Sequence, residues 1–176
     1  MRKLKITELH RISIDEFKRA NKIPLVIVLD NVRSLHNIGS IFRTADAFLV
    51  ERVILCGISS TPPDAEIHKT ALGAEYSVAW EYSESTVEAA LSLKADGYCV
   101  FSLEQADKSF MLDEILLNKS KKYVIILGNE VHGVQQEVVD CCDACIEIPQ
   151  YGTKHSLNVS IAGGIVIWTF FNQLKS

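Results

Sequence analysis

The stretch Leu25-Val26-Ile27-Val28-Leu29, with Pro24 before it and Asp30-Asn31 after it, decides the fold of this chain. A continuous β-branched run of this length is typical of a strand that is buried on both faces, as in a parallel sheet. Further runs along the chain predict strands at residues 52–55, 76–80, 98–101, 123–127 and 144–148.

Helical patterns alternate with these strands. They predict helices at residues 36–49, 86–94, 111–117 and 134–141 and a last helix from Ser156, whereas residues 57–68 read as a loop. The alternation predicts an α/β fold, a mostly parallel sheet with helices on both faces. We expect an N-terminal helix or arm over residues 1–22 and one domain over residues 23–176.

Composition narrows the class of protein. With 176 residues, 48% apolar and 23% charged, the chain is typical of one globular domain. A net charge of −4 and a pI near 5.7 argue against a basic nucleic-acid coat protein and still allow a local basic patch. The C-terminal apolar run contains Gly163, Gly164 and Thr169 and is shorter than the ~20 residues of a membrane span. It therefore predicts a core helix and no membrane partner.

Five cysteines form no disulfide framework, which predicts a reduced, cytoplasmic setting. Cys142-Asp143-Ala144-Cys145 has C-x-x-C spacing, but no second ligand pair follows, and it joins a helix end to a strand. It predicts neither a metal site nor a redox site. The glycine-rich dinucleotide and phosphate loops and the G-x-S-x-G elbow are also missing from the sequence.

The block from Ile148 to Ser160 places a polar cluster, Ser156, Asn158 and Ser160, at the head of an apolar helix. Polar groups in a buried setting are costly unless they have partners. The block therefore indicates a ligand or a polar partner. A simpler interpretation is that Asn158 satisfies backbone groups near the helix start.

Polar residues also follow other strands of the predicted sheet. Ligands of open α/β sheets bind beyond the carboxyl ends of the strands. Four predicted strand ends are followed by polar or small residues: Asn31, Arg33 and Asn37; Ser102 to Glu104; Gly128 to Glu130; and Pro149, Gly152 and Ser156 to Asn158. Together they predict a binding site at this edge. Glu130 alone could be an acid that favours a helix N-terminus.

The predicted helix 36–49 can be phased from its apolar positions. Ile38, Ile41, Phe42, Ala45, Phe48 and Leu49 share one face. Arg43 lies nearly opposite and Asn37 at the border. Taken alone, Arg43 is an ordinary solvated charge.

Three blocks then join these observations. Asn31-x-Arg33-x-x-x-Asn37-x-Gly39-x-x-x-Arg43-x-Ala45, Leu127-Gly128-Asn129-Glu130-x-x-Gly133 and the stretch from Ile148 to Ala162 resemble the three motifs of the SpoU/TrmH RNA ribose 2′-O-methyltransferases, of the SPOUT superfamily. The resemblance covers roughly residues 24–172. One departure is Val131, where the family often has glycine; its Cβ restricts the backbone.

The resemblance implies a SPOUT fold with a C-terminal trefoil knot and a homodimer with active sites at its interface. It also implies S-adenosylmethionine as methyl donor, a ribose 2′-hydroxyl of tRNA or rRNA as acceptor, and no metal. Arg43 would be the key catalytic residue. Because a guanidinium is hard to deprotonate, we expect it to hold a phosphate and stabilise the developing alkoxide.

The other implied site residues fall into three groups. Asn37, Glu130, Ser156 and Asn158 would complete the catalytic site. Leu103, Gly128, Ile148 and Leu157 would contact the cofactor, largely through backbone groups. Arg33, Lys69, Lys154 and His155 would bind RNA phosphates. Two alternatives stay open: a non-catalytic RNA-binding protein on the same fold, and a SPOUT methyltransferase that acts on an RNA base.

Overall fold

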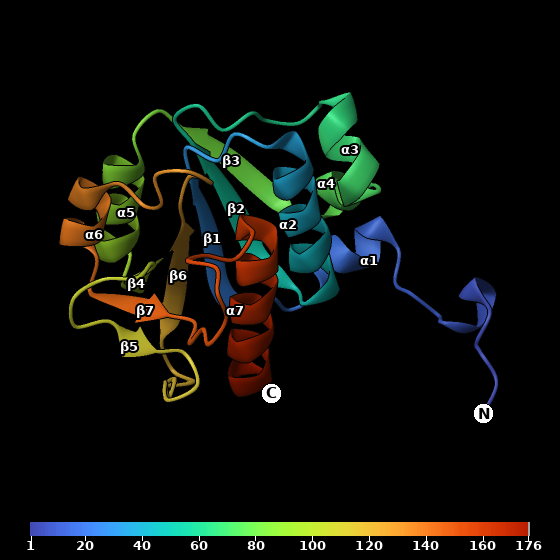
Figure 1. The fold of residues 1–176 in the computed structure, drawn as a ribbon. Helices are drawn as coiled ribbons and strands as arrows, with labels where there is room; N and C mark the ends of the chain where they lie inside the picture. Colours follow the sequence, from blue (N-terminus) through green and yellow to red (C-terminus); the bar gives the residue numbers. More distant parts are fainter. Residues whose placement is uncertain (176) are drawn as a thin grey trace.

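The chain folds around one seven-stranded sheet in which every strand pair is parallel (Figure 1). The computed structural model describes residues 1–175, apart from the Ile6 side chain. The strand order is β3-β2-β1-β6-β4-β7-β5. The strands are β1 Ile23–Asp30, β2 Val50–Cys56, β3 Ala79–Ser83, β4 Tyr98–Leu103, β5 Phe110–Met111, β6 Lys122–Leu127 and β7 Ala144–Glu147. The predicted α/β class is confirmed, and the trefoil knot stays a prediction.

Helices cover both faces of the sheet. They are α1 Ile14–Arg19, α2 Leu35–Ala47, α3 Ala65–Ala71, α4 Ala74–Ser77, α5 Thr86–Ala95, α6 Gln136–Cys141 and α7 Val159–Leu174, after a 3-10 turn at Ile6–Glu8. The first four helices and α7 pack on one face, and α5 and α6 on the other (Figure 1). No helix among the described residues is both long and apolar enough to cross a membrane.

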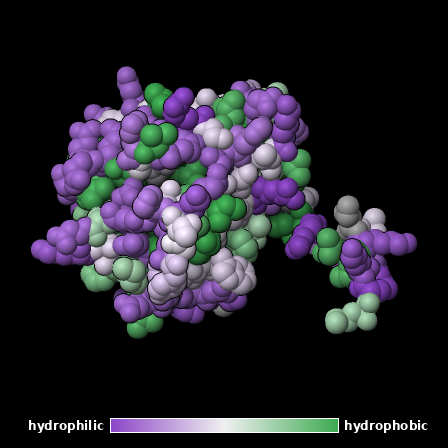
Figure 2. All heavy atoms as spheres, in the orientation of Figure 1, coloured by the Kyte–Doolittle hydropathy of each residue, from purple (hydrophilic) through white to green (hydrophobic). Residues whose placement is uncertain are grey.

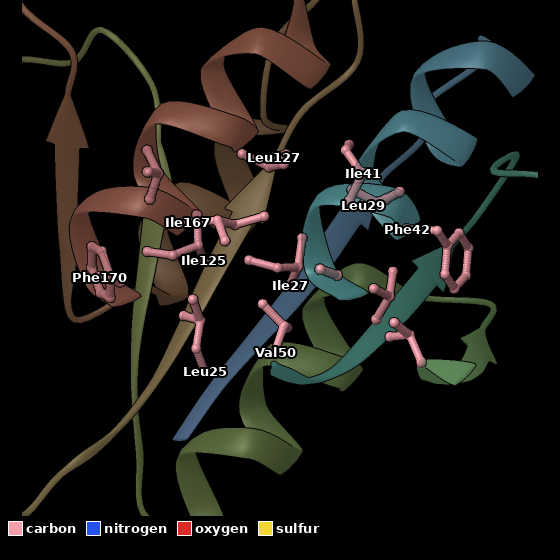
Figure 3. Packing of buried hydrophobic residues seen from close by; sticks show 14 of the residues in the cluster. Leu25, Ile27, Leu29, Ile41, Phe42, Val50, Ile125, Leu127, Ile167 and Phe170 are labelled. Atoms are coloured by element: carbon pink, nitrogen blue, oxygen red, sulfur yellow. The ribbon is translucent and has the colours of Figure 1, made fainter. Parts of the chain in front are cut away.

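The central strand β1 contributes side chains to both halves of the core, one on each face of the sheet. Leu25, Ile27 and Leu29 are fully buried against the α2 and α7 side, and Val26 and Val28 against the α5 and α6 side. Figure 3 shows the first set interleaved with side chains of α2, β6 and α7. Burial on both faces is why the stretch that decides the fold is apolar at every position.

The phasing of α2 is confirmed. Ile38, Ile41, Phe42 and Ala45 are fully buried, Phe48 and Leu49 are half-buried, and Arg43 is exposed.

Four element predictions are wrong. The strand predicted at residues 76–80 begins only at Ala79, because the preceding residues end α4 at Ser77. Residues 111–117 contain no helix, because Phe110–Met111 pairs with the β7 edge. Tertiary pairing overrides local propensity there. The predicted loop 57–68 ends early, since Asp64 caps α3 by accepting hydrogen bonds from the N–H groups of Glu66 (2.8 Å) and Ile67 (3.2 Å). The last helix starts at Val159, after its N-cap Asn158.

Helices α2 and α3 approach each other closely at Gly39. A Cβ on Gly39 would lie 2.2 Å from Thr70 Oγ1 and 2.3 Å from the carbonyl oxygen of Ile67. The Thr70 hydroxyl also donates to the carbonyl of His36 at 3.0 Å. A glycine is therefore required at this crossing, which fixes α3 beside the start of α2.

We predict that Gly39→Ala destabilises the protein by about 1–3 kcal/mol, because the added methyl overpacks a backbone contact. The free energy of unfolding in urea measures this change. Ser40→Ala, on the same helix, is the matched control and should stay within about 0.5 kcal/mol of the wild type. A Gly39→Ala protein at least as stable as the wild type would contradict the close approach.

Candidate active site

A cavity of about 730 Å³ opens at the carboxyl ends of β4, β6 and β7. The structure brings all four predicted cofactor contacts into its lining, namely Leu103, Gly128, Ile148 and Leu157. Glu130, His155, Ser156 and Asn158 line it as well. The volume lies within the range of small-molecule sites, and a lining of apolar side chains with a few polar groups is typical of them.

One wall of the cavity is a tight loop after β6. Asn129 and Gly133 exchange both backbone hydrogen bonds, each at 2.9 Å. A Cβ on Gly128 would lie 2.1 Å from the Gly133 carbonyl carbon, and Gly133 itself has φ +69°. Both glycines are therefore structural requirements of this loop.

Val131 does not distort the loop after β6. Its backbone is not among the positive-φ positions of the chain, and its side chain is 71% exposed. The Asn129 side chain holds the turn by accepting hydrogen bonds from the N–H groups of Val131 (2.9 Å) and His132 (3.1 Å). The departure from the family pattern therefore costs the loop no backbone strain.

The Glu130 carboxylate reaches from this loop to the start of α2. It accepts hydrogen bonds from the N–H groups of Arg33 (3.0 Å) and Ser34 (2.9 Å) and from Asn37 Nδ2 (3.0 Å). Burial raises the pKa of Glu130, but these donors outweigh it and lower the pKa overall. Glu130 is therefore an anion at neutral pH. Glu130 does lie at a helix N-terminus, but at that of α2 and not at that of α6, the helix that follows Glu130 in the chain.

Asn37 links Glu130 to the C-terminal helix α7. Its Oδ1 accepts a hydrogen bond from Asn158 Nδ2 at 3.1 Å. Asn158 Oδ1 in turn caps α7 by accepting from the N–H groups of Ser160 (2.9 Å) and Ile161 (3.3 Å). Asn158 thus satisfies backbone groups and has a polar partner too. A chain from Glu130 through Asn37 to Asn158 joins the three motif-bearing segments.

We predicted a buried setting for the polar block before α7, but the block is exposed. Every residue from 151 to 158 is exposed, and Ser160 is half-buried. Ser156 and His155 line the cavity from this exposed segment, and Lys154 lies beside them outside the lining. The prediction was wrong because the helix begins at Val159, with its apolar run, and not at Ser156, so the polar residues before it lie in an exposed segment.

Asn37 lies outside the cavity lining but is hydrogen-bonded to Glu130 and Asn158 of that lining. Arg43 is the predicted catalytic residue that the single chain does not connect to the cavity. It is exposed on α2, on the side that also carries His36 and Ser40, and it is absent from the cavity lining. Within residues 1–175 its side chain forms no hydrogen bond or ion pair. A guanidinium without partners is free to meet a ligand or a second chain.

The predicted RNA contacts are exposed on the surface of the domain. The side chain of Arg33 is exposed while its N–H binds Glu130. Lys69 on α3 is exposed and pairs with Glu66 at 2.6 Å. Arg33 and the segment with Lys154 and His155 adjoin residues that line the cavity.

Residues without a predicted role also shape the site. Glu104, after β4, accepts a hydrogen bond from the N–H of Val134 at 3.0 Å, and Gln105 Nε2 donates to the carbonyl of His155 at 2.6 Å. Glu104 and Gln105 both line the cavity, and they connect the end of β4 to the loop after β6 and to the segment before α7. Their position directly after a strand was the signal in the sequence.

The cysteines near β7 have a structural setting. Cys141 and Cys142 both donate through sulfur to the carbonyl of Val138 at 3.1 Å, and burial raises the pKa of Cys142 to about 12. It is therefore a thiol at neutral pH. Across the part of the chain that the structure describes, no three His, Cys, Asp or Glu side chains gather as a metal site requires.

Comparison with known proteins agrees with this geometry. The chain is 29% identical over 153 residues to the 23S rRNA (guanosine-2′-O-)-methyltransferase RlmB of Neisseria meningitidis serogroup B. This alignment covers 87% of this chain and 60% of that protein. It is 32% identical over 145 residues to the tRNA (guanosine(18)-2′-O)-methyltransferase of Aquifex aeolicus, covering 82% of this chain and 67% of that one. The chain thus spans only about 60% of the length of the first relative.

A solved structure shares the fold. The AdoMet-bound rRNA methyltransferase from Sinorhizobium meliloti superimposes with a TM-score of 0.80 at 29% identity, over 91% of this chain and 61% of that one. The SpoU rRNA Methylase family matches residues 24–168, which include every strand except the first residue of β1. Because this match spans far more than half of the sequence, the chain belongs to the SpoU rRNA Methylase family.

Proposed function

We propose that this protein transfers a methyl group from S-adenosylmethionine to a ribose 2′-hydroxyl of tRNA or rRNA, as a homodimer. The observation that carries the proposal is the hydrogen-bonded chain Glu130–Asn37–Asn158 beside the cavity. It links the three motif segments at one edge of the sheet. The named relatives methylate riboses in both classes of RNA, so both substrates stay within the proposal.

The cavity suits S-adenosylmethionine in size and charge. Its lining contains the carboxylates of Glu104 and Glu130 and no lysine or arginine. A negative wall favours a ligand that carries a sulfonium and an ammonium cation. Leu103, Gly128, Ile148 and Leu157 would hold this cofactor. When bound, it supplies an activated methyl group, so the transfer requires no metal.

The residues of this chain have distinct roles in the proposed reaction. Arg43 stays protonated, so it acts by charge: it holds an RNA phosphate near the acceptor and stabilises the developing alkoxide. Asn37 and Asn158 position the acceptor side, and Glu130 keeps both loops in register. Ser156, exposed at the cavity rim, completes the catalytic set.

A second copy of the chain would bring Arg43 to the site. On α7, the side chains of Ile161, Ile165 and Trp168 are 57%, 38% and 50% exposed and share one face at helical spacing. Leu157, at the cavity, is also 39% exposed. Figure 2 shows apolar surface in this region. A dimer that covers this face would place the cavity of one copy against the other copy, whose Arg43 is free.

Three further assignments belong to this proposal. Residues 1–22 form an arm and residues 23–176 the methyltransferase domain, of which Ser176 lies outside the described residues. Arg33, Lys69, Lys154 and His155 contact RNA phosphates at the domain surface. The five free cysteines support a cytoplasmic location.

We predict that Arg43→Ala lowers the rate of methyl transfer by at least about 100-fold, the scale expected when charge stabilisation of a transition state is lost. Calorimetry with S-adenosylmethionine should give the same dissociation constant as the wild type, because Arg43 lies outside the cavity lining. Nucleoside mass spectrometry of the RNA product identifies the methylated position.

The same measurements separate the rivals. No cofactor binding by the wild type would favour a non-catalytic RNA-binding protein. A methylated base would favour a SPOUT base methyltransferase. An Arg43→Ala protein with wild-type rates would refute the role of Arg43.

We also predict that two inactive variants restore each other. Leu103→Lys puts a cation into the cavity and blocks the cofactor, while Arg43→Ala removes the guanidinium. A heterodimer of the two, purified with two affinity tags, should regain about half of the wild-type activity, because one of its two sites pairs an intact cavity with an intact Arg43 across the interface. Each homodimer serves as the control. An inactive heterodimer would show that Arg43 and the cavity act within one chain.

A further inference from the structure

The N-terminal arm, residues 1–22, has the opposite charge to the rest of the protein. Seven of the 18 lysines and arginines and three of the 22 acids lie in it, so it carries +4 while residues 23–176 carry −8. The match to the family begins at residue 24, so the arm lies wholly outside the matched region. The family model therefore does not account for its charge.

The acidic body is poorly suited to attract RNA by itself. Several of its cations are occupied by neighbouring carboxylates: Arg52 pairs with Glu51 at 2.6 Å, and Lys94 pairs with Asp143 at 2.9 Å. A body of −8 repels a polyanion, and protein affinity for nucleic acids comes largely from cations that neutralise phosphates. An RNA methyltransferase on such a body gains affinity from cations beyond those proposed on the domain surface.

The arm is anchored at its root. Ser13 and Glu16 form a capping box at the start of α1, and Phe17 is buried against the body. The Lys22 ammonium donates to the carbonyls of Phe17 and Ala20 and lies 4.3 Å above the Phe17 ring centroid. The arm therefore leaves the domain from a defined point.

Beyond this root, the arm extends away from the body (Figures 1 and 2). The side chains of Lys3, Lys5 and Arg11 are exposed and, within the described chain, form no hydrogen bond or ion pair. Arg2 is different, because it pairs with Glu8 inside the arm at 2.6 Å. Three unpaired cations are thus held away from the acidic surface.

The root of the arm lies on the side of the molecule that carries Arg43. Helix α1 packs against α4, which follows α3 with Lys69, and both α3 and α4 pack against α2. Figure 1 shows the arm leaving on this side, opposite α5 and α6. An RNA held by the arm would therefore lie next to the exposed face of α2.

We propose that the arm is an RNA-capture element that binds the phosphate backbone irrespective of sequence. The inference rests on the proposed function, because it assumes an RNA substrate. Lys3, Lys5 and Arg11 neutralise phosphates and raise the concentration of RNA beside Arg43, while the domain supplies the chemistry. The acidic body of a second copy is the other surface that a basic arm could bind.

The test is the salt dependence of RNA binding. An unmodified tRNA transcript is a sufficient probe, because backbone binding is independent of sequence. We predict that K3Q/K5Q/R11Q weakens binding about ten-fold at low salt and flattens the plot of log Kd against log salt by about 2, at roughly 0.7–0.9 for each lost phosphate contact. The matched control K119Q/K121Q/K122Q removes three exposed lysines at and just before the start of β6 and should retain the wild-type slope.

Two further measurements decide between the partners. Calorimetry with S-adenosylmethionine and sedimentation should match the wild type for both triple variants, which shows an intact domain and unchanged assembly. An unchanged salt slope for K3Q/K5Q/R11Q, or a change in its sedimenting mass, would overturn the inference, and the latter would assign the arm to a second copy. Methyl transfer by the wild type, read by mass spectrometry, tests the proposed function separately from binding.

Discussion

The site depends on one carboxylate that reaches from the loop after β6 to the N-terminus of α2. Glu130 accepts hydrogen bonds from the backbone N–H groups of Arg33 and Ser34, directly before α2, and a third from Asn37. Asn37 then holds Asn158, which caps α7. Segments about a hundred residues apart are thereby fixed to one another by groups that each satisfy a helix end. The same bonds that stabilise the helix starts therefore also set the shape of the cavity.

This arrangement separates the cofactor cavity from Arg43. Asn37 and Arg43 lie on the same helix, but Asn37 faces α7 and is buried, whereas Arg43 faces away and is exposed. Helical spacing makes this separation unavoidable in one chain. The proposed dimer through the exposed face of α7 would reconcile the motif with the geometry, which is why it is central to the proposed function.

Much of the fold was predictable because burial leaves a clear pattern. The strand after Pro24 and the apolar face of α2 were recognised from their periodicity, and the strand-end residues around Gly128 led to the cavity. Helix α3 and strand β5 were not predicted. Helix α3 follows closely after Pro62-Pro63, which read as a loop, and β5 forms through its pairing with β7. The hydrogen bond between Asn37 and Asn158 joins residues 121 positions apart and is invisible to any local pattern.

The distribution of charge follows from the two ligands that the proposed reaction requires. S-adenosylmethionine carries cations and RNA carries anions, so one surface cannot attract both. The cavity wall is negative, with Glu104 and Glu130, whereas Arg43 on α2 and Lys3 and Lys5 in the arm lie outside its lining. A basic residue moved into the cavity would strengthen contact with RNA at the expense of the cofactor. Under the proposed function, keeping the two charges apart would let an acidic domain act on a polyanion that a basic arm holds.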